Sequence, residues 1–362
     1  MKKHVVILKS RAGHCGGLEK YSARIAAAFA EKGARVSLLG GESVAKWPSF
    51  LRLEQYDRYV QTWLKNNPAD LVFGMDRNRH QTHLRAGNGV HAAYLKSRIA
   101  AEGRLKYLIC RFNPLHRKIL ELEQAGFENP ALQKLFTNSH MVRSEILNYY
   151  KVDPKKIKVI HNGVEWEEMA DAFQNWENKR EMGFKKFGLD PSHFHFLFVG
   201  NGYLRKGLDR LLEGLSRLST RDFHLSVVGK DKRMELYRAK AMQLGLKTQV
   251  RFFGAQSEIR LFYQMADVLV IPSFYDPFAN VTVEALAMGL FVLSSKQNGG
   301  AEILTKENGA VIEDLLEPDS MVNALELTLK ERKTPMSAAA RRQSVASLDF
   351  SKQMRTLIEA CE

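Results

Sequence analysis

Cysteines, long apolar runs and clusters of metal-ligating side chains are all scarce in this chain of 362 residues. The three cysteines, Cys15, Cys110 and Cys361, are too few and too scattered for a disulfide framework or a zinc site. No apolar run approaches the ~18 residues that a membrane-spanning helix needs. We therefore expect a protein of a reducing cytoplasm that has no transmembrane segment and holds no metal.

Two further absences concern the N-terminal region. A run of only four apolar residues precedes Lys9, so we expect the N-terminus to be a first β-strand and not a signal peptide. The loop after that strand contains Gly16 and Gly17 but no complete Gly-x-Gly-x-x-Gly motif. This absence counts against an ordinary dinucleotide-dependent dehydrogenase.

Negative charge is scarce in only one half of the chain. The net charge is +14, and residues 1–165 hold 28 Lys and Arg against 14 Asp and Glu, whereas the remaining residues hold 26 of each. A basic half beside a neutral half suggests that one domain faces a polyanion, such as an anionic membrane, a phosphorylated saccharide or a nucleic acid.

Short apolar runs alternate with longer helical patterns along the whole chain, which favours an α/β fold with parallel sheets. The apolar runs predict five strands in each half, and segments such as 18–32 and 234–244 have the apolar spacing of helices. Two Rossmann-like domains follow from this arrangement. We place the first at residues 1–165 and the second at 166–339, and we expect a C-terminal helix within 340–362 to pack back on the first domain.

Residues 269–289 hold the most specific pattern of the sequence. An apolar run ends at Pro272, a polar loop with Asp276 follows, and a helical pattern then carries Glu284. A strand, a loop and a helix start in this order form a crevice at the carboxyl edge of a parallel sheet, and the helix start offers N–H groups to a phosphate. Because a carboxylate beside a diphosphate is suited to neutral groups such as sugar hydroxyls, the pattern predicts a nucleotide-sugar site.

Two other loops carry residues suited to the same ligand. Gly200 is followed by Arg205 and Lys206, and two adjacent cations on a glycine-rich loop can neutralise a diphosphate leaving group. Gly229 and Lys230 end the next predicted strand. The predicted donor-binding residues are Gly16, Gly17, Gly200, Gly229, Lys230, Asp276, Pro277, Phe278, Ala279, Asn280, Val281 and Glu284.

The basic first half contains two more candidate features. His91 follows a glycine-bracketed loop, which raises the odds that it is functional. Residues 94–118 then predict a helix with cations around an apolar stripe, suited either to an anionic lipid surface or to core packing with a solvated face. Because the charge excess lies in the same half, we favour the membrane. The predicted acceptor and membrane contacts are Lys96, Arg98, Arg104, Lys106 and Arg111.

The 269–289 block resembles the donor-site signature of the family 4 retaining glycosyltransferases, in which a Glu, seven residues and a second Glu follow Pro-Ser. Glu284 matches the second Glu, whereas Asp276 stands in the place of the first, so the chain departs from the family pattern there. The likeness spans most of the chain. The segments 67–70 and 205–207 make it most similar to the compact lipopolysaccharide core glucosyltransferases.

This resemblance implies a GT-B fold, in which two Rossmann-like domains have parallel sheets facing a central cleft. It implies transfer of a hexose, with glucose as first choice, from a UDP-sugar to a hydroxyl of a lipid-anchored saccharide such as the lipopolysaccharide core. The reaction retains the anomeric configuration and uses no cofactor and no metal. The implied catalytic residues are His91, Arg205, Lys206 and Glu284.

The expected partners are the nucleotide-sugar donor, the lipid-linked saccharide and the inner face of the cytoplasmic membrane, to which a monomer would bind peripherally. A UDP-sugar epimerase or a phosphorylase of the same two-domain plan is an alternative. A basic nucleic-acid-binding protein is another, but no nucleic-acid-binding module stands out and this alternative leaves the 269–289 block unexplained.

Overall fold

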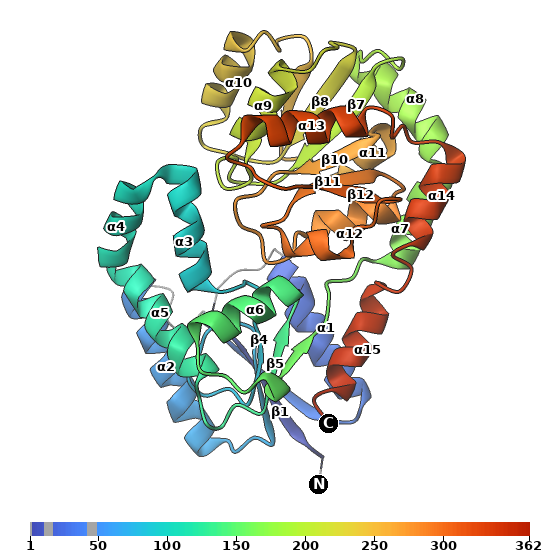
Figure 1. The fold of residues 1–362 in the computed structure, drawn as a ribbon. Helices are drawn as coiled ribbons and strands as arrows, with labels where there is room; N and C mark the ends of the chain where they lie inside the picture. Colours follow the sequence, from blue (N-terminus) through green and yellow to red (C-terminus); the bar gives the residue numbers. More distant parts are fainter. Residues whose placement is uncertain (1, 11–16, 42–48) are drawn as a thin grey trace. The chain divides into compact units, whose positions relative to one another are not determined.

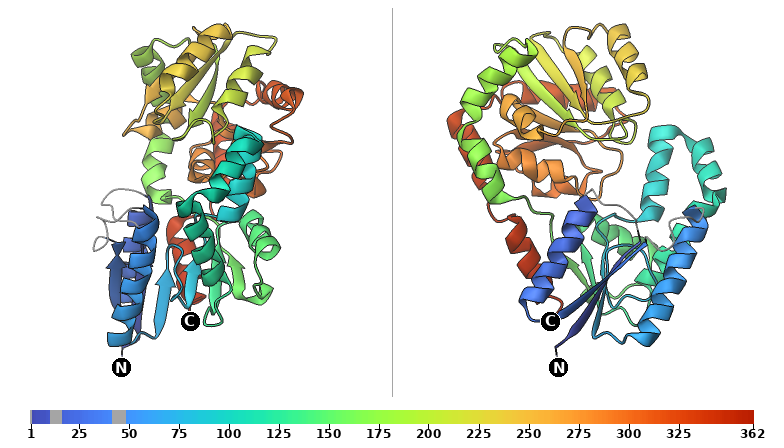
Figure 2. Two further views of the ribbon diagram at one scale, coloured as in Figure 1. Left: turned by 90° about the vertical axis from the view of Figure 1, so that its left-hand side faces the viewer. Right: turned by 180° about the vertical axis from the view of Figure 1, so that it is seen from behind.

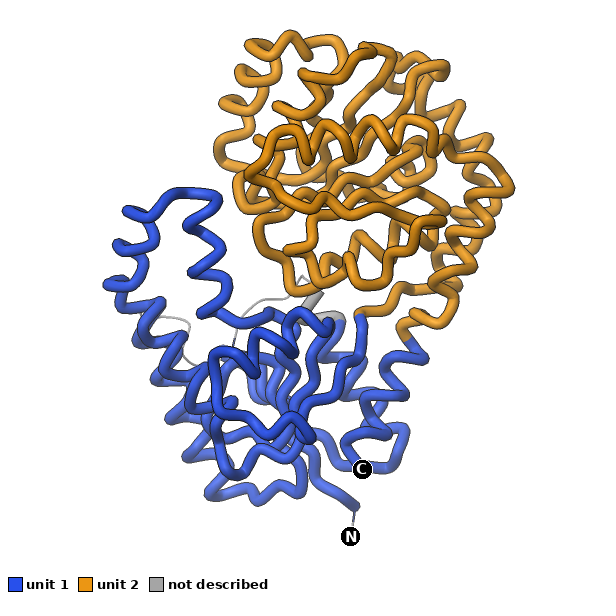
Figure 3. The backbone as a smooth tube through the Cα atoms, in the orientation of Figure 1, with its two compact units in different colours: residues 1–161, 351–362 blue, residues 162–350 orange. Residues whose placement is uncertain are grey.

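The computed structural model describes residues 2–10, 17–41 and 49–362. The chain divides into two compact units: unit 1 comprises Met1–His161 and Ser351–Glu362, and unit 2 comprises Asn162–Phe350 (Figure 3). The sequence placed the boundary at residue 165 and assigned the tail to the first domain from residue 340. In the structure the tail belongs to unit 2 up to Phe350.

Unit 1 is built on a parallel six-stranded sheet with the order β2-β1-β3-β4-β5-β6 (Figure 1). Its first strand lies between the second and the third, so the direction of winding reverses between β1 and β3. Ligands of doubly wound sheets bind beyond the carboxyl ends of the strands at such a switch point. The strands are β1 (His4–Lys9), β2 (Arg35–Gly40), β3 (Leu71–Gly74), β4 (His83–Arg85), β5 (Lys134–Thr137) and β6 (Ile157–Val159).

The helices of unit 1 cover its sheet, apart from one helical arm. Helices α3 and α4 form a hairpin that projects from the layered body of the unit (Figures 1 and 2). On the sheet, Tyr56 is buried against Val6 and Leu8 and donates its hydroxyl to the Leu39 carbonyl over 2.9 Å. The helices are α1 (Gly17–Glu31), α2 (Ser49–Asn66), α3 (His91–Glu102), α4 (Arg104–Phe112), α5 (Pro114–Phe127), α6 (His140–Tyr149), the short 3₁₀ helix η2 (Pro154–Lys156) and, from its second residue on, α15 (Phe350–Glu359).

Unit 2 repeats the plan with a parallel six-stranded sheet in the order β12-β11-β10-β7-β8-β9. The winding reverses between β7 and β10, where Phe196 lies opposite Val268. Strands β8 and β10 are buried along their whole length, as expected for a parallel sheet covered on both faces. The strands are β7 (Phe194–Val199), β8 (Phe223–Val228), β9 (Val250–Gly254), β10 (Val268–Ile271), β11 (Phe291–Ser295) and β12 (Gly309–Ile312).

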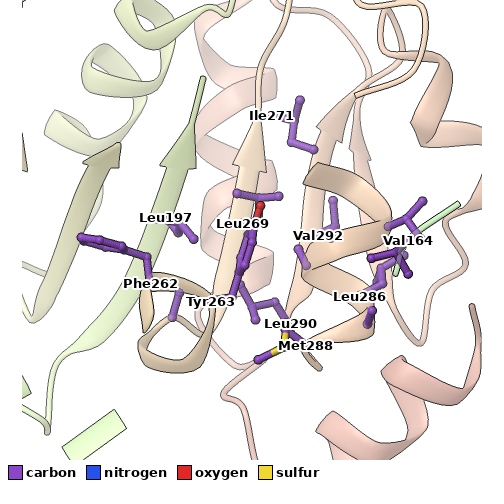
Figure 4. Close-up of a cluster of buried hydrophobic side chains, with 14 of the residues drawn as sticks. Val164, Leu197, Phe262, Tyr263, Leu269, Ile271, Leu286, Met288, Leu290 and Val292 are labelled. Atoms are coloured by element: carbon purple, nitrogen blue, oxygen red, sulfur yellow. The ribbon is translucent and has the colours of Figure 1, made fainter. Parts of the chain in front are cut away.

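A large apolar cluster holds the helices of unit 2 on this sheet. Leu269 and Val292 point from neighbouring strands toward Leu286 and Met288, and Tyr263 is buried among them (Figure 4). The helices are α7 (Trp166–Gln174), α8 (Trp176–Phe187), α9 (Leu208–Ser216), α10 (Met234–Gln243), α11 (Ile259–Met265), α12 (Asn280–Ala287), the 3₁₀ helix η3 (Gly299–Ile303), α13 (Pro318–Thr328) and α14 (Pro335–Gln343).

The parallel α/β architecture is confirmed, but each sheet has one strand more than the five predicted. The additional strands are β4, with the sequence His-Leu-Arg, and β12, with Gly-Ala-Val-Ile. A strand of three residues with one aliphatic side chain produces no period-two signal, and β12 is an edge strand with little apolar bulk.

The prediction of a single amphipathic helix over residues 94–118 is wrong. The chain forms three helices there, because Gly103 caps the end of α3 after Glu102 and α5 begins with Pro114 after an Asn113 cap. Asn113 accepts a hydrogen bond from the Leu115 N–H over 2.9 Å. Within the described ranges, none of the helices has the length and apolar character that crossing a bilayer requires.

Candidate functional site

The switch point of unit 2 brings together two loops that the sequence had singled out. The loop after β7 carries Arg205 and Lys206, and the loop after β10 carries Asp276. The two loops are joined through their backbones, since the Phe274 N–H donates to the Arg205 carbonyl over 2.9 Å. Residues 70 positions apart in the chain therefore share one site at the carboxyl edge of the sheet.

Asp276 is the counter-ion of Lys206 in this site. The Lys206 Nζ donates to the Asp276 Oδ2 over 2.6 Å, and both residues are buried. Arg205 is more open, with 40% of its side chain exposed, and its Nη1 lies 3.4 Å from the same oxygen and donates to the Tyr275 carbonyl over 2.9 Å. Two cations and one carboxylate leave the cluster with a single positive charge.

Two glycines allow these loops to come close together. Gly207 has φ of 75°, and a Cβ there would lie 1.7 Å from the Pro272 carbonyl oxygen. Gly229 has φ of 133°, and its Cβ would lie 2.1 Å from the Gly200 carbonyl oxygen. Any other residue at these two positions would push the loops apart, so glycine is a steric requirement of the site.

The start of α12 lies in the same region. Its N-cap residue, Ala279, has no side chain that could satisfy the first N–H groups of the helix. The Ala279 N–H itself donates to Asn298 Oδ1 over 2.9 Å, and the buried Asn298 also holds Ser294 and Gly300 through hydrogen bonds of 2.9 and 3.1 Å. Asn298 therefore anchors the start of α12 through contacts between loops.

Glu284 lies on the second turn of α12 in an environment unlike that of Asp276. Its Oε2 accepts a hydrogen bond of 2.7 Å from the hydroxyl of Tyr263, a fully buried residue on α11. Burial raises the pKa of the Glu284 carboxyl group, and the bond from Tyr263 opposes this by favouring the ionised form. Tyr263 was not singled out from the sequence, where it reads as an ordinary apolar helix position.

The other predicted donor residues fall into three groups. Lys230 is exposed on the loop after β8, and its N–H donates to Asn201 Oδ1 over 2.6 Å. Phe278 is part of the apolar core and Val281 packs against it, whereas Asn280 is exposed. The remaining three are Gly17, which begins α1 in unit 1, Gly16, which lies outside the described residues, and Pro277, which is partly buried.

Family models match both halves of the chain. The model of the glycosyl transferases group 1 matches residues 179–345, and that of Glycosyltransferase Family 4 matches residues 15–168. The lipopolysaccharide glucosyltransferase WaaG of Escherichia coli (strain K12) is 26% identical over 342 residues, which cover 90% of this chain and 89% of that protein. The chain is a glycosyltransferase that combines a family 4 domain with a group 1 domain.

Solved structures show the same fold. The glycosyltransferase resembles the crystal structure of WaaG, a glycosyltransferase involved in lipopolysaccharide biosynthesis, with a TM-score of 0.75 and 23% identity over 98% of this chain and 97% of that one. The Anabaena protein Alr3699/HepE in complex with UDP and glucose gives a TM-score of 0.64 at 15% identity, with 98% of both chains covered. The predicted GT-B fold is thereby confirmed.

In unit 1 of the glycosyltransferase, His91 is held by a buried carboxylate. The backbone N–H of His91 lies 2.9 and 2.8 Å from the two carboxylate oxygens of Glu123. These oxygens also accept hydrogen bonds from Arg77 and from the Tyr150 hydroxyl, over 2.6 Å each. The His91 Nε2 is hydrogen-bonded to His116 Nδ1 over 3.0 Å. Burial, followed by the nearby Arg77, lowers the pKa of His91 to about 3, so its ring is neutral at physiological pH.

The predicted membrane residues differ in their availability. Arg98 forms a two-pronged pair with Glu102 at 2.6 and 3.0 Å, and Lys106 lies 3.3 Å from the same carboxylate, so both are engaged within the arm. Lys96, Arg104 and Arg111 are exposed. The sequence prediction had treated all five cations alike, and only the folded helices show which of them are paired.

Proposed function

We propose that this glycosyltransferase moves a hexose, with glucose as first choice, from a UDP-sugar to a hydroxyl of a lipid-anchored saccharide such as the lipopolysaccharide core. The observation that carries this proposal is the buried Lys206–Asp276 pair with Arg205 at the switch point of unit 2, beside the uncapped start of α12. The likeness to the Escherichia coli lipopolysaccharide glucosyltransferase over most of both chains supports the choice of glucose and of the acceptor.

Each part of the site has a role in this reaction. Arg205 and Lys206 stabilise the negative charge that builds up on the departing diphosphate, and Asp276 holds the Lys206 ammonium group in place. The N–H groups at the start of α12 offer further donors to a phosphate. Glu284 accepts hydrogen bonds from hydroxyls of the ribose or the sugar through its carboxylate, which Tyr263 orients.

The proposed reaction retains the anomeric configuration by a front-face displacement. The acceptor oxygen forms a bond to the anomeric carbon while the bond from that carbon to the diphosphate oxygen breaks, and the leaving diphosphate takes the proton of the acceptor hydroxyl. Positive charge on Arg205 and Lys206 stabilises the leaving group, so the proposed reaction needs neither a metal nor a cofactor. His91 would contact the transferred sugar as a neutral hydrogen-bonding group, in keeping with its lowered pKa.

We also propose that the enzyme binds the inner face of the cytoplasmic membrane peripherally through α4. Four apolar side chains on one face of this helix are exposed: Leu105 by 73%, Leu108 by 49%, Ile109 by 62% and Phe112 by 79%. The exposed Arg104 and Arg111 lie on the same helix. An apolar face flanked by cations is typical of helices that lie in the surface of an anionic bilayer.

Nucleotide release from a panel of UDP-, GDP- and ADP-sugars, with and without a lipopolysaccharide or membrane-lipid extract, tests the proposal. We expect UDP release that requires the extract, persists in EDTA and disappears in Glu284→Gln but not in the exposed control Glu235→Gln. Conversion of a UDP-sugar without any acceptor would instead indicate an epimerase. The absence of release from every donor would overturn the proposed transfer.

A further inference from the structure

Unit 1 has a cavity at its own switch point, between the carboxyl ends of β1 and β3. Its volume is about 230 Å³, and its walls include Ser10, which follows β1, and Asp76, which follows β3. Helix α2 contributes Arg52, and α5 contributes Leu115 and Ile119. The cavity therefore occupies the place in unit 1 where the Lys206–Asp276 pair lies in unit 2, at the usual ligand position of a doubly wound sheet.

The carboxylate of Asp76 is fixed in position. Its Oδ2 accepts from the Ser10 N–H over 3.1 Å and from the Ser10 hydroxyl over 3.0 Å, and its Oδ1 accepts from Asn88 over 3.2 Å. A carboxylate offers about four lone-pair positions, so these three bonds orient the group and leave room for one further donor. Such a carboxylate is ready to accept a hydroxyl without reorganising.

Arg77, which also lines the cavity, is equally fixed. Its Nε donates to the buried Glu123 over 2.6 Å and its Nη2 to the Gly89 carbonyl over 3.1 Å. The third nitrogen, Nη1, makes no hydrogen bond with any residue that the structure describes. Since Glu123 also holds the start of α3 and His91, the same buried carboxylate supports both Arg77 and the His91 loop.

We infer that this cavity binds one sugar ring of the acceptor, with Asp76 accepting from a hydroxyl and Arg52 or Arg77 donating to its neighbour. Leu115 and Ile119 give an apolar wall for the C–H face of the ring. The volume is below the ~300 Å³ at which pockets for drug-sized ligands begin, so it suits one ring and not an oligosaccharide. A phosphate is disfavoured because Glu123 already neutralises Arg77 and Asp76 offsets Arg52, so the lining has no net positive charge to attract an anion.

This inference rests on the proposed function, since it identifies where the acceptor of that reaction binds. The test uses the water-soluble core oligosaccharide released from lipopolysaccharide by deacylation, which removes any contribution from the membrane. We expect Arg52→Ala, Asp76→Asn and the cavity-filling Ile119→Trp each to raise the KM for this oligosaccharide at least tenfold. Donor affinity stays unchanged, and Arg58→Ala, on the same helix with 66% of its side chain exposed, behaves as the wild type.

Direct binding of the oligosaccharide, followed by saturation-transfer NMR, separates the two proposals. If the oligosaccharide binds the wild type but not Arg52→Ala, and no donor supports transfer, the cavity assignment stands and the proposed reaction is wrong. An unchanged KM and unchanged binding in all three variants would overturn the cavity assignment. If the variants bind the phosphorylated oligosaccharide less tightly than the wild type but bind the dephosphorylated one equally well, the cavity binds phosphate. The assignment to hydroxyls is then wrong.

Discussion

At the scale of single residues, the two carboxylates of the candidate donor site have opposite surroundings. Asp276 lies against Lys206 and Arg205, whereas Glu284 accepts a hydrogen bond from the neutral hydroxyl of Tyr263. A carboxylate between cations serves to hold them in place. A carboxylate among apolar groups with one neutral partner has an oxygen left for ligand hydroxyls, so Glu284 is the better candidate for direct donor contact.

Replacing Lys206 by Ala removes a cation from the leaving group. We expect kcat to fall by about 10²–10³, the usual effect of deleting one preorganised electrostatic donor. Because this change leaves Asp276 buried with only the longer contact to Arg205, thermal unfolding must be measured in parallel. In the double variant Lys206→Ala/Asp276→Asn we expect stability to recover while turnover stays low. Recovery of turnover would show that the effect of the single variant came from destabilisation.

Replacing Tyr263 by Phe removes the hydrogen bond that opposes the raised pKa of Glu284. The pKa of Glu284 then rises further, so its carboxylate becomes protonated at a higher pH and accepts hydroxyls less well. We expect the acidic limb of kcat/KM for the donor to move to higher pH. Tyr237→Phe, at another buried tyrosine of unit 2, should leave the profile in place. Identical profiles for wild type and Tyr263→Phe would contradict a positioning role.

At the scale of elements, α4 leaves most of its residues exposed. Cys110 is its buried residue, whereas its apolar face from Leu105 to Phe112 is exposed. A soluble helix is normally stabilised by burying such a face, and here it has no cover among the described residues of the chain. Its amphipathic composition was visible in the sequence, but its exposure was not.

The double variant Leu108→Ser/Phe112→Ser tests α4 as a membrane contact. Full burial of each apolar side chain contributes about 1.5–3 kcal/mol, so we expect binding to anionic lipid vesicles to weaken at least tenfold. Leu236→Ser, at a residue of α10 that is 65% exposed, serves as the control. Arg104→Gln/Arg111→Gln should mainly remove the part of the binding that depends on salt, at about 1 kcal/mol for each cation. Equal vesicle binding by all variants would exclude α4.

At the scale of the whole molecule, both units bury histidines in their neutral form. Burial lowers the pKa of His83 and of His224 to about 4 and that of His91 to about 3, and it lowers the pKa of His195 well below its usual value. The unfolded chain takes up protons at these positions below pH ~6.5, whereas the folded chain does not. The free energy of unfolding therefore falls as the pH decreases through this range.

We accordingly expect a lower Tm at pH 5.5 than at pH 7.5, with each buried histidine contributing up to about 1.4 kcal/mol per pH unit below ~6.5. His224→Gln removes one of these groups, and the glutamine oxygen can still accept the bond that His224 receives from the Asp190 N–H over 3.0 Å. The decrease in Tm should therefore be smaller in this variant. A decrease as large as in the wild type would show that His224 is protonated in the folded state.

Local sequence patterns predicted much of this structure. The 269–289 segment predicted a strand, a loop and a helix, and the structure has β10, a loop and α12 there. The loop of Arg205 and Lys206 was also predicted at the end of a strand. These features depend on neighbours in the chain, because a buried parallel strand has an apolar run and a helix has its own spacing. The division of residues 94–118 into three helices also has local signals, Gly103 and Pro114. The apolar stripe along this segment nevertheless led to the prediction of one continuous helix.

The sequence by itself determined the family, the two parallel α/β units, the excess of positive charge in the first half and the loops that carry the donor-site candidates. Only the tertiary structure decided that Asp276 pairs with Lys206, that Tyr263 orients Glu284, that Glu123 holds both His91 and Arg77, and that the apolar face of α4 is exposed. The physical reason is distance along the chain. Hydrogen bonds and ion pairs form between whatever groups folding brings within ~3 Å, and the spacing of residues in one segment carries no information about a partner many residues away.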